Sequence, residues 1–138
     1  MNEPKSVFEL DGARMDGLET FFDQVSKNVI PGAKWGRNLD GFNDVLRGGF
    51  GTPEGGFVLK WKNVARAKEA LGYGETARWL ARGASRVHPS NVAEWDRRRA
   101  AAAAGEGETL FDILVAIVRV HGAGGAEEED GVELVLDD

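Results

Sequence analysis

The first third of the chain combines a short β-type run with apolar residues at helical spacing. Val7 to Leu10 mixes β-branched and aromatic residues before Gly12, which predicts a short strand. The following apolar positions recur every three or four residues and predict a buried helix face over 16–29: Leu18, Phe21, Phe22, Val25 and Val29. We expect Asp16 to cap this helix and Pro31 to end it, because proline lacks the N–H that continues the hydrogen-bond ladder.

A second helix is predicted over residues 38–47. Asn38 is a favourable N-cap, because its side-chain oxygen can accept a backbone N–H from the first turn. Gly36, just before it, can adopt backbone angles that a side chain would forbid. From this start the apolar residues fall at i, i+3 and i+7 and form one stripe: Leu39, Phe42 and Leu46.

The other side of this predicted helix is acidic. Asp40 and Asp44 fall one turn apart, with Asn43 between them, and two like charges at that spacing repel each other by ~0.2–0.5 kcal/mol. An exposed face whose N-terminal Asp favours the helix dipole would explain the pair without a binding role. A helix that keeps both carboxylates is also suited to presenting an anionic face to a cationic partner.

Two further strands and two further helices are predicted on either side of an unusual middle section. Residues 57–59 form an apolar run typical of a buried strand, and Asn63 can cap a helix over 63–71. Residues 108–120 have the spacing and length of a largely buried helix, and residues 132–136 resemble a closing strand. Helical crossovers favour parallel pairing, so we expect an α/β fold with a small three-stranded parallel sheet packed with helices.

The middle section, residues 72–105, predicts one or two inserted helices. A short helical stretch contains Trp79, the sequence His-Pro-Ser-Asn at 88–91 interrupts it, and an alanine-rich helix containing Trp95 follows. We expect Trp79 and Trp95 to anchor these helices.

Composition narrows the class of protein. The 138 residues fit one domain, and the absence of cysteine excludes disulfides and suits a reducing compartment. No apolar run approaches the length of a membrane span or follows a basic segment as a signal peptide does. We therefore expect a cytoplasmic protein without a membrane partner.

The net charge of −6 is unevenly distributed. Residues 60–100 hold ten of the 17 Lys and Arg residues but only four of the 23 acidic ones. The acidic remainder favours basic partners over nucleic acid, although an acidic surface can also serve solubility alone. We expect the acidic run at 127–130 to be a solvated connection. We expect the arginines of 78–99 to be a solvated helix face, or to pair with the protein's own acidic surface, rather than to form an RNA site.

Candidate catalytic chemistry is sparse. His88 lies in a proline turn and His121 at a predicted helix C-terminus, where the helix dipole favours a histidine without any catalytic role. No cluster has metal-ligand spacing, and no nucleophile elbow or phosphate loop is present in the sequence. We expect a protein that is not an enzyme and that has no catalytic residue, metal or cofactor.

Residues 35–46 resemble the central helix of barstar-like ribonuclease inhibitors. The shared pattern is Gly-x-Asn-Leu-Asp-x-x-x-Asp-x-Leu after an aromatic residue, here Trp35. Flanking segments resemble the family's strands and other helices: 7–12, 18–22, 56–63, 108–114 and 132–136. The resemblance is strongest over 35–62.

The resemblance implies one barstar-like domain over residues 1–138. Its core comprises residues 5–71 and 106–138, and residues 72–105 are an insertion outside the resemblance. The implied fold is the same three-stranded parallel sheet packed with helices that the pattern of apolar residues predicts.

The resemblance also implies a function and a set of binding residues. In the family the central helix enters the active site of a microbial ribonuclease, and its carboxylates take the positions of RNA phosphates. Asp44 matches the dominant acidic anchor and Asp40 the second one. The remaining candidates for partner binding are Trp35, Gly36 and Asn38, which match the approach to the helix, and Asn43.

Several positions depart from the family pattern. Lys34 and Arg37 stand where the best-known member has an aromatic residue and an acid, and Asn43 replaces a tryptophan. Arg47 adds a positive charge to the binding face, and an acidic residue of the later helix is replaced by Ala116. The expected partner is therefore a diverged ribonuclease or a toxin nuclease with a basic active site, inhibited one to one by an immunity-type protein.

An interaction module is the main alternative, in which the basic insertion at 72–105 binds a protein or nucleic acid. Deletion of 75–104 would separate the two hypotheses, because an inhibitor would retain its activity. A nuclease is a weaker third possibility, since it would need RNA cleavage that depends on His88 or His121.

Overall fold

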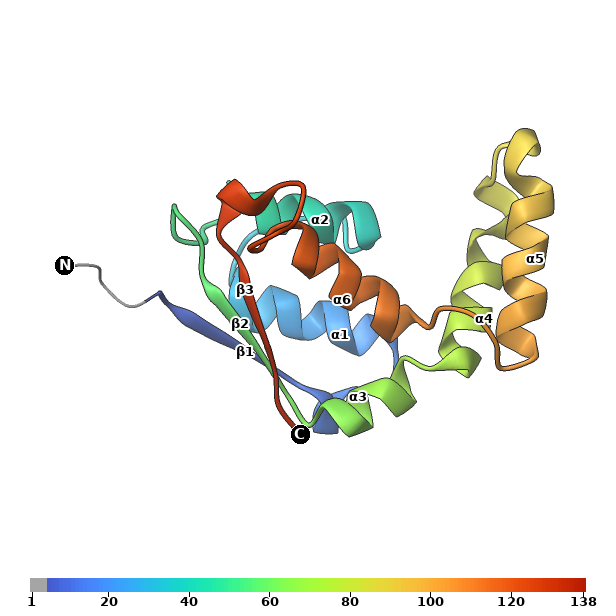
Figure 1. Ribbon diagram of the computed structural model, residues 1–138, viewed down its shortest axis with the longest axis horizontal. Helices are drawn as coiled ribbons and strands as arrows, with labels where there is room; N and C mark the ends of the chain where they lie inside the picture. The colour runs from blue at the N-terminus through green and yellow to red at the C-terminus, as the bar shows by residue number, and fades with distance from the viewer. Residues whose placement is uncertain (1–4) are drawn as a thin grey trace.

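The computed structural model describes residues 5–138; residues 1–4, which the expected single domain also includes, lie outside the described residues. The centre of the fold is a parallel sheet with the spatial order β1-β2-β3. Helices pack along one face of this sheet, as Figure 1 shows. The strands are β1 (Val7–Asp11), β2 (Val58–Lys62) and β3 (Glu133–Leu136).

Six α-helices accompany the sheet in the described part of the chain. They are α1 (Leu18–Gln24), α2 (Leu39–Arg47), α3 (Val64–Ala70), α4 (Tyr73–Gly83), α5 (Val92–Ala103) and α6 (Leu110–Val120). The predicted α/β class and three-stranded parallel sheet are thus confirmed. None of the helices in residues 5–138 is long and apolar enough to cross a membrane.

The core lies between the sheet and helices α1, α2 and α6. Trp61 of β2 is fully buried at its centre, with ring centroids 5.4 Å from Phe21 of α1 and 5.0 Å from Phe111 of α6. Strand residues alternate between the two faces, so the opposite face of the sheet carries charged side chains. One ion pair on that face joins Lys62 Nζ to Glu9 at 3.0 Å.

The cap predicted for the first helix is wrong. The cap position is Gly17, and the N–H of Leu18 donates to Oε2 of Glu75 at 2.7 Å. Oγ1 of Thr20 accepts the N–H groups of Asp16 and Gly17 at 2.9 and 3.2 Å. The Asp16 carboxylate instead accepts a hydrogen bond from the Thr20 hydroxyl, so a residue 57 positions away supplies the cap.

The cap predicted for α3 is correct in position, but its side chain makes no capping hydrogen bond. Asn63 occupies the cap position, but its backbone is left-handed (φ 53°) and its side-chain amide donates to Oδ1 of Asp11 at 2.7 Å. The side chain therefore ties the end of β1 to the end of β2. Oδ1 of Asp138 accepts the N–H of Ala65 at 2.9 Å in its place.

Helices α4 and α5 form a hairpin that projects from the sheet and its covering helices, as Figure 1 shows. Trp79 and Trp95, the predicted anchors, lie in contact with ring centroids 5.9 Å apart, and Arg98 lies over both rings. The base of the hairpin is bonded to the core, because the hydroxyl of Thr76 accepts the N–H of Leu110 at 2.8 Å.

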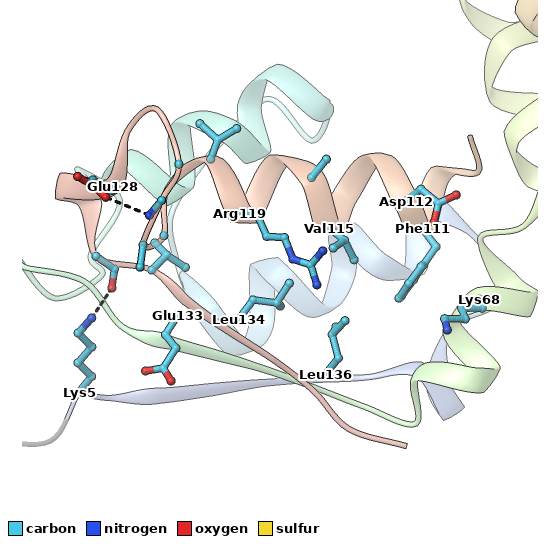
Figure 2. A pocket seen from close by; sticks show the side chains of 18 residues that line it. Lys5, Lys68, Phe111, Asp112, Val115, Arg119, Glu128, Glu133, Leu134 and Leu136 are labelled. Atoms are coloured by element: carbon cyan, nitrogen blue, oxygen red, sulfur yellow. Dashed lines mark hydrogen bonds between the residues drawn. The ribbon is translucent and has the colours of Figure 1, made fainter. Parts of the chain in front are cut away.

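The free edge of β3 borders a groove beneath α6, which Figure 2 shows from close by. The groove runs along the strand from the Gly131 region to Lys68 of α3.

Candidate partner interface

The local sequence of α2 fixes its orientation. Oδ1 of Asn38 accepts the N–H of Gly41 at 2.7 Å, so the predicted N-cap is present. Phe42, Val45 and Leu46 are buried against the core, while Leu39 is half-buried. The buried stripe leaves the opposite side of the helix facing outward.

Asp40 and Asp44 are exposed on this outward side. Among residues 5–138, no ion pair involves the Asp40 carboxylate, so its charge is uncompensated at short range. Oδ1 of Asp44, by contrast, lies 2.9 Å from Nη1 of Arg47 one turn later. The two carboxylates therefore share a face but differ in electrostatic environment.

Arg47 bridges α2 to the acidic loop at 127–130. Its Nε and Nη2 donate to the two carboxylate oxygens of Glu127 at 2.8 and 3.2 Å. Hydrogen bonds that Arg47 donates to Glu127, and more weakly to Asp44, raise the pKa of Arg47 above its usual value. The same contact lowers the pKa of Glu127. The acidic run is exposed at Glu128 and Glu129, as expected, but Glu127 and Asp130 are bonded to other elements of the protein.

The half-buried side chain of Asn43 is bonded within the protein. Its Oδ1 lies 2.6 Å from Nε2 of His121, and Nδ1 of that ring lies 2.6 Å from Oδ2 of Asp130. His121 is 0% exposed. This chain of contacts holds α2 against the end of α6 and gives His121 a structural position.

His121, Glu127 and Asp130 are also the one group of described residues whose ligand atoms approach metal-binding spacing, within 4.8 Å of one another. Both ring nitrogens of His121 already have partners in the protein, and the Glu127 carboxylate is bonded to Arg47. The arrangement is that of a hydrogen-bonded network. His88, the other histidine, is exposed in the α4–α5 hairpin and bonded to Ser90.

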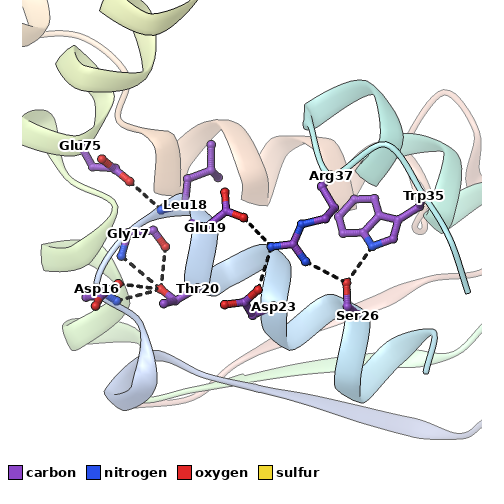
Figure 3. Close-up of polar contacts among 10 residues, drawn as sticks. All are labelled: Asp16, Gly17, Leu18, Glu19, Thr20, Asp23, Ser26, Trp35, Arg37 and Glu75. Carbon is purple, nitrogen blue, oxygen red and sulfur yellow. Dashed lines mark hydrogen bonds and ion pairs between the residues drawn. The ribbon is translucent and has the colours of Figure 1, made fainter. Parts of the chain in front are cut away.

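The approach to α2 is fixed on α1 and the turn after it. Trp35 is half-buried, with its indole N–H donating to the hydroxyl of Ser26 at 2.8 Å and its ring 5.4 Å from Phe22. Gly36 does not use its freedom to adopt a positive φ, and the left-handed residue is the next one, Arg37 (φ 47°). Figure 3 shows the contacts that hold Trp35 and Arg37 against α1 and the turn after it.

From the sequence, Arg37 is only a departure from the family pattern. Its Nη2 lies 2.6 Å from Oε1 of Glu19 and 2.7 Å from Oδ1 of Asp23, and its Nη1 donates to Ser26 (Figure 3). Hydrogen bonds to Glu19 and Asp23 raise its pKa above the usual value. The i, i+4 spacing of Glu19 and Asp23 on one helix was the available signal.

The six predicted binding residues therefore divide into two groups. Asp40 and Asp44 present exposed carboxylates, whereas the side chains of Trp35, Asn38 and Asn43 are bonded within the protein. Gly36, also exposed, lies in the segment that leads to the helix. The outward surface is consequently a small acidic face on a rigidly held helix.

The comparisons with known proteins point to one family. The chain matches the family model described as Barstar (barnase inhibitor) over residues 5–99. No curated protein matches the chain. The matched range runs from β1 through most of α5, so it includes much of the predicted insertion and stops before α6 and β3. Since the match covers more than half of the sequence, the chain belongs to the barstar family of barnase inhibitors.

Proposed function

We propose that this protein inhibits a ribonuclease by placing the acidic face of α2 in the enzyme's active site. The observation that carries the proposal is the pair of exposed carboxylates, Asp40 and Asp44, one turn apart on a helix whose other side is buried in the core. Ribonuclease sites gather basic groups around a phosphate, and side-chain carboxylates can occupy the same positions.

The fixed position of α2 favours such a role. Asn43, Asn38 and Trp35 are each bonded within the protein, so the helix and its approach are held before a partner arrives. Binding then loses little conformational entropy, which is the general advantage of a preorganised interface.

Arg47 must give up one of its contacts if Asp44 pairs with a basic enzyme group. Because Arg47 is also bonded to Glu127, it would keep a carboxylate partner after releasing Asp44. The exchange therefore leaves no charge without a partner, which limits its cost.

The identity of the partner is a further part of the proposal. We expect a bacterial type of cytoplasmic immunity protein that blocks one ribonuclease or toxin nuclease. The basic residues Lys34 and Arg37 beside α2, and the loss of an acidic residue at Ala116, favour an enzyme that has diverged from barnase.

Inhibition of a panel of guanyl-specific microbial ribonucleases tests the proposal. Asp44→Asn should weaken inhibition by about 2 kcal/mol or more, as expected for a charged hot spot at the centre of an interface. Asp40→Asn should have a smaller effect in the same direction. Asp96→Asn, an exposed carboxylate on α5, is the matched control and should leave inhibition unchanged.

Circular dichroism should show the same fold for all three variants, because each carboxylate is exposed. A loss of less than about tenfold for Asp44→Asn would remove this residue from the centre of the site. Equal losses for Asp44→Asn and Asp96→Asn would indicate a general charge effect.

A second candidate function is binding of a protein or nucleic acid by the basic hairpin. It is favoured by the position of Arg86 and Arg99, which are exposed on a hairpin that projects from the rest of the fold (Figure 1). Against it, Arg78 and Arg97 pair with Glu75 and Glu94 on the same helices.

Point substitutions test this candidate better than deletion of 75–104. The deletion would remove Glu75 and Thr76, whose side chains accept the first N–H groups of α1 and α6. The double variant Arg86→Gln/Arg99→Gln should leave ribonuclease inhibition unchanged if α2 is the site. A loss of binding comparable to that of Asp44→Asn would favour the hairpin.

A further inference from the structure

The two edge strands of the sheet differ in whether side chains bond to their outward backbone groups. At β1 the amide of Gln24 pairs with both backbone groups of Asp11, accepting its N–H at 2.7 Å and donating to its carbonyl at 2.9 Å. The amide of Asn28 donates to the carbonyl of Glu9 at 3.0 Å. Side chains thus occupy the positions that another strand would take, so this edge is blocked.

The edge of β3 has no such cover among the described residues. Glu133 and Asp137 donate their N–H groups to Phe57 and Trp61 on the β2 side at 2.9 and 2.8 Å. Because residues of a parallel strand alternate between its two sides, the backbone groups of Leu134 and Leu136 point outward. An unpaired strand edge of this kind is a template for a further strand.

A groove of about 1280 Å³ lies beside this edge, between β3 and α6 (Figure 2). Its apolar wall contains Phe111 and Val115 of α6 together with Leu134 and Leu136 of β3. Leu136 is 39% exposed, although it belongs to the strand face that packs towards the helices. A strand added at this edge could cover that apolar surface with alternate side chains.

The charges of the groove favour an acidic occupant. Arg119 points from α6 towards β3 and Lys68 lies at the far end (Figure 2), and neither has a carboxylate partner within residues 5–138. The carboxylates of Asp112 and Glu128 are bonded to backbone N–H groups, and Glu133 points away from α6. Two cations without a carboxylate partner are unusual in a chain of net charge −6.

We propose that the edge of β3 and this groove bind an extended segment of a partner protein whose side chains facing α6 are apolar in the middle and acidic at both ends. The segment adds a fourth strand to the sheet through the backbone of Leu134 and Leu136. Of the side chains that face α6, the apolar ones contact Phe111 and Val115, and the carboxylates pair with Arg119 at one end and Lys68 at the other. The alternate side chains face the opposite side of the sheet. This surface is separate from the acidic face of α2, so the proposal does not depend on ribonuclease inhibition.

Peptide titration of the isotope-labelled full chain, followed by NMR, tests the proposal. The probe is the capped peptide Glu-Thr-Val-Thr-Val-Thr-Glu, whose glutamates and valines share one face of a strand. The matched controls replace glutamate by lysine or N-methylate alternate amides. The acidic peptide should shift the Leu134 and Leu136 amide signals and slow their hydrogen exchange. Both control peptides should bind about tenfold more weakly or not at all.

Substitutions in the groove give a second measurement. Lys68→Gln/Arg119→Gln should weaken binding of the acidic peptide by about fivefold, and Lys27→Gln near the blocked β1 edge should not change it. Equal binding of the N-methylated peptide, or shifts at Glu9 and Asp11 instead, would overturn the proposal. A dimer that pairs through the β3 edge would also overturn the proposal, and sedimentation velocity without peptide would detect it.

Discussion

At the scale of residues, two arginines balance the charges around α2. Arg37 is bonded to Glu19 and Asp23, and Arg47 to Asp44 and Glu127, so each guanidinium has two carboxylate partners. Asp40 lies between these arginines in the sequence and has no ion-pair partner among the described residues. The acidic face thus combines one uncompensated carboxylate with one held in place by a neighbouring cation.

Removal of the Arg47 guanidinium should separate these effects. Arg47→Ala frees the Asp44 carboxylate, so we expect inhibition of the cognate ribonuclease to become tighter by no more than about fivefold, as fits an exposed ion pair. The pKa of Glu127, now lowered by Arg47, should rise towards its usual 4.5 in an NMR titration.

The pH dependence of this pair has a defined sign. Since the folded pKa of Glu127 is lowered, its contact with Arg47 stabilises the fold above the usual pKa and is lost as the pH falls through the folded value.

The control for Arg47→Ala in the inhibition experiment is Arg66→Ala, which breaks an exposed ion pair with Glu69 on α3. Weaker inhibition by Arg47→Ala would show that the guanidinium itself contacts the enzyme or must hold Asp44 in position.

At the scale of elements, apolar spacing predicted the order of strands and helices, and the cap at Asn38 was also predictable, but the contacts that fix the starts of α1 and α3 were not. Trp61 and Phe21 follow the strand and helix periods of their segments, so their burial was predictable. The first N–H of α1 is bonded to Glu75, 57 residues away, and no local pattern shows such a contact. The contact between Arg47 and Glu127, 80 residues apart, could not be predicted for the same reason.

The contact between Glu75 and α1 should be measurable as stability. The Glu75 carboxylate is largely buried, and its removal in Glu75→Ala leaves the N–H of Leu18 without an acceptor. We expect the free energy of unfolding in urea to fall by about 1–3 kcal/mol. Glu69→Ala, which removes an exposed carboxylate of α3, should change it by less than about 0.5 kcal/mol. An equally small effect of Glu75→Ala would mean that water replaces this carboxylate.

At the scale of the whole molecule, the charge is divided between two regions. The acidic face of α2 lies on the main body, and the arginine-rich hairpin of α4 and α5 projects from it, as Figure 1 shows. Outside residues 60–100 the chain has seven basic and nineteen acidic residues. Such a separation orients an approaching basic enzyme towards the acidic body and away from the hairpin.

Association with a basic ribonuclease should therefore slow as salt rises. The screening length falls from about 30 Å at 0.01 M to about 10 Å at 0.1 M ionic strength, so long-range attraction is lost over this range. We expect the association rate constant in stopped-flow mixing to fall by about tenfold or more, behaviour for which barnase and barstar are themselves the reference example.

The dissociation rate should change much less with salt, because it depends on contacts already formed at the interface. Asp40→Asn should lower the association rate at low salt and lose that effect at high salt, since its carboxylate acts mainly at a distance. Asp44→Asn should instead raise the dissociation rate at every salt concentration. An association rate independent of salt would contradict electrostatic steering while leaving the role of Asp44 in the bound complex to its own test.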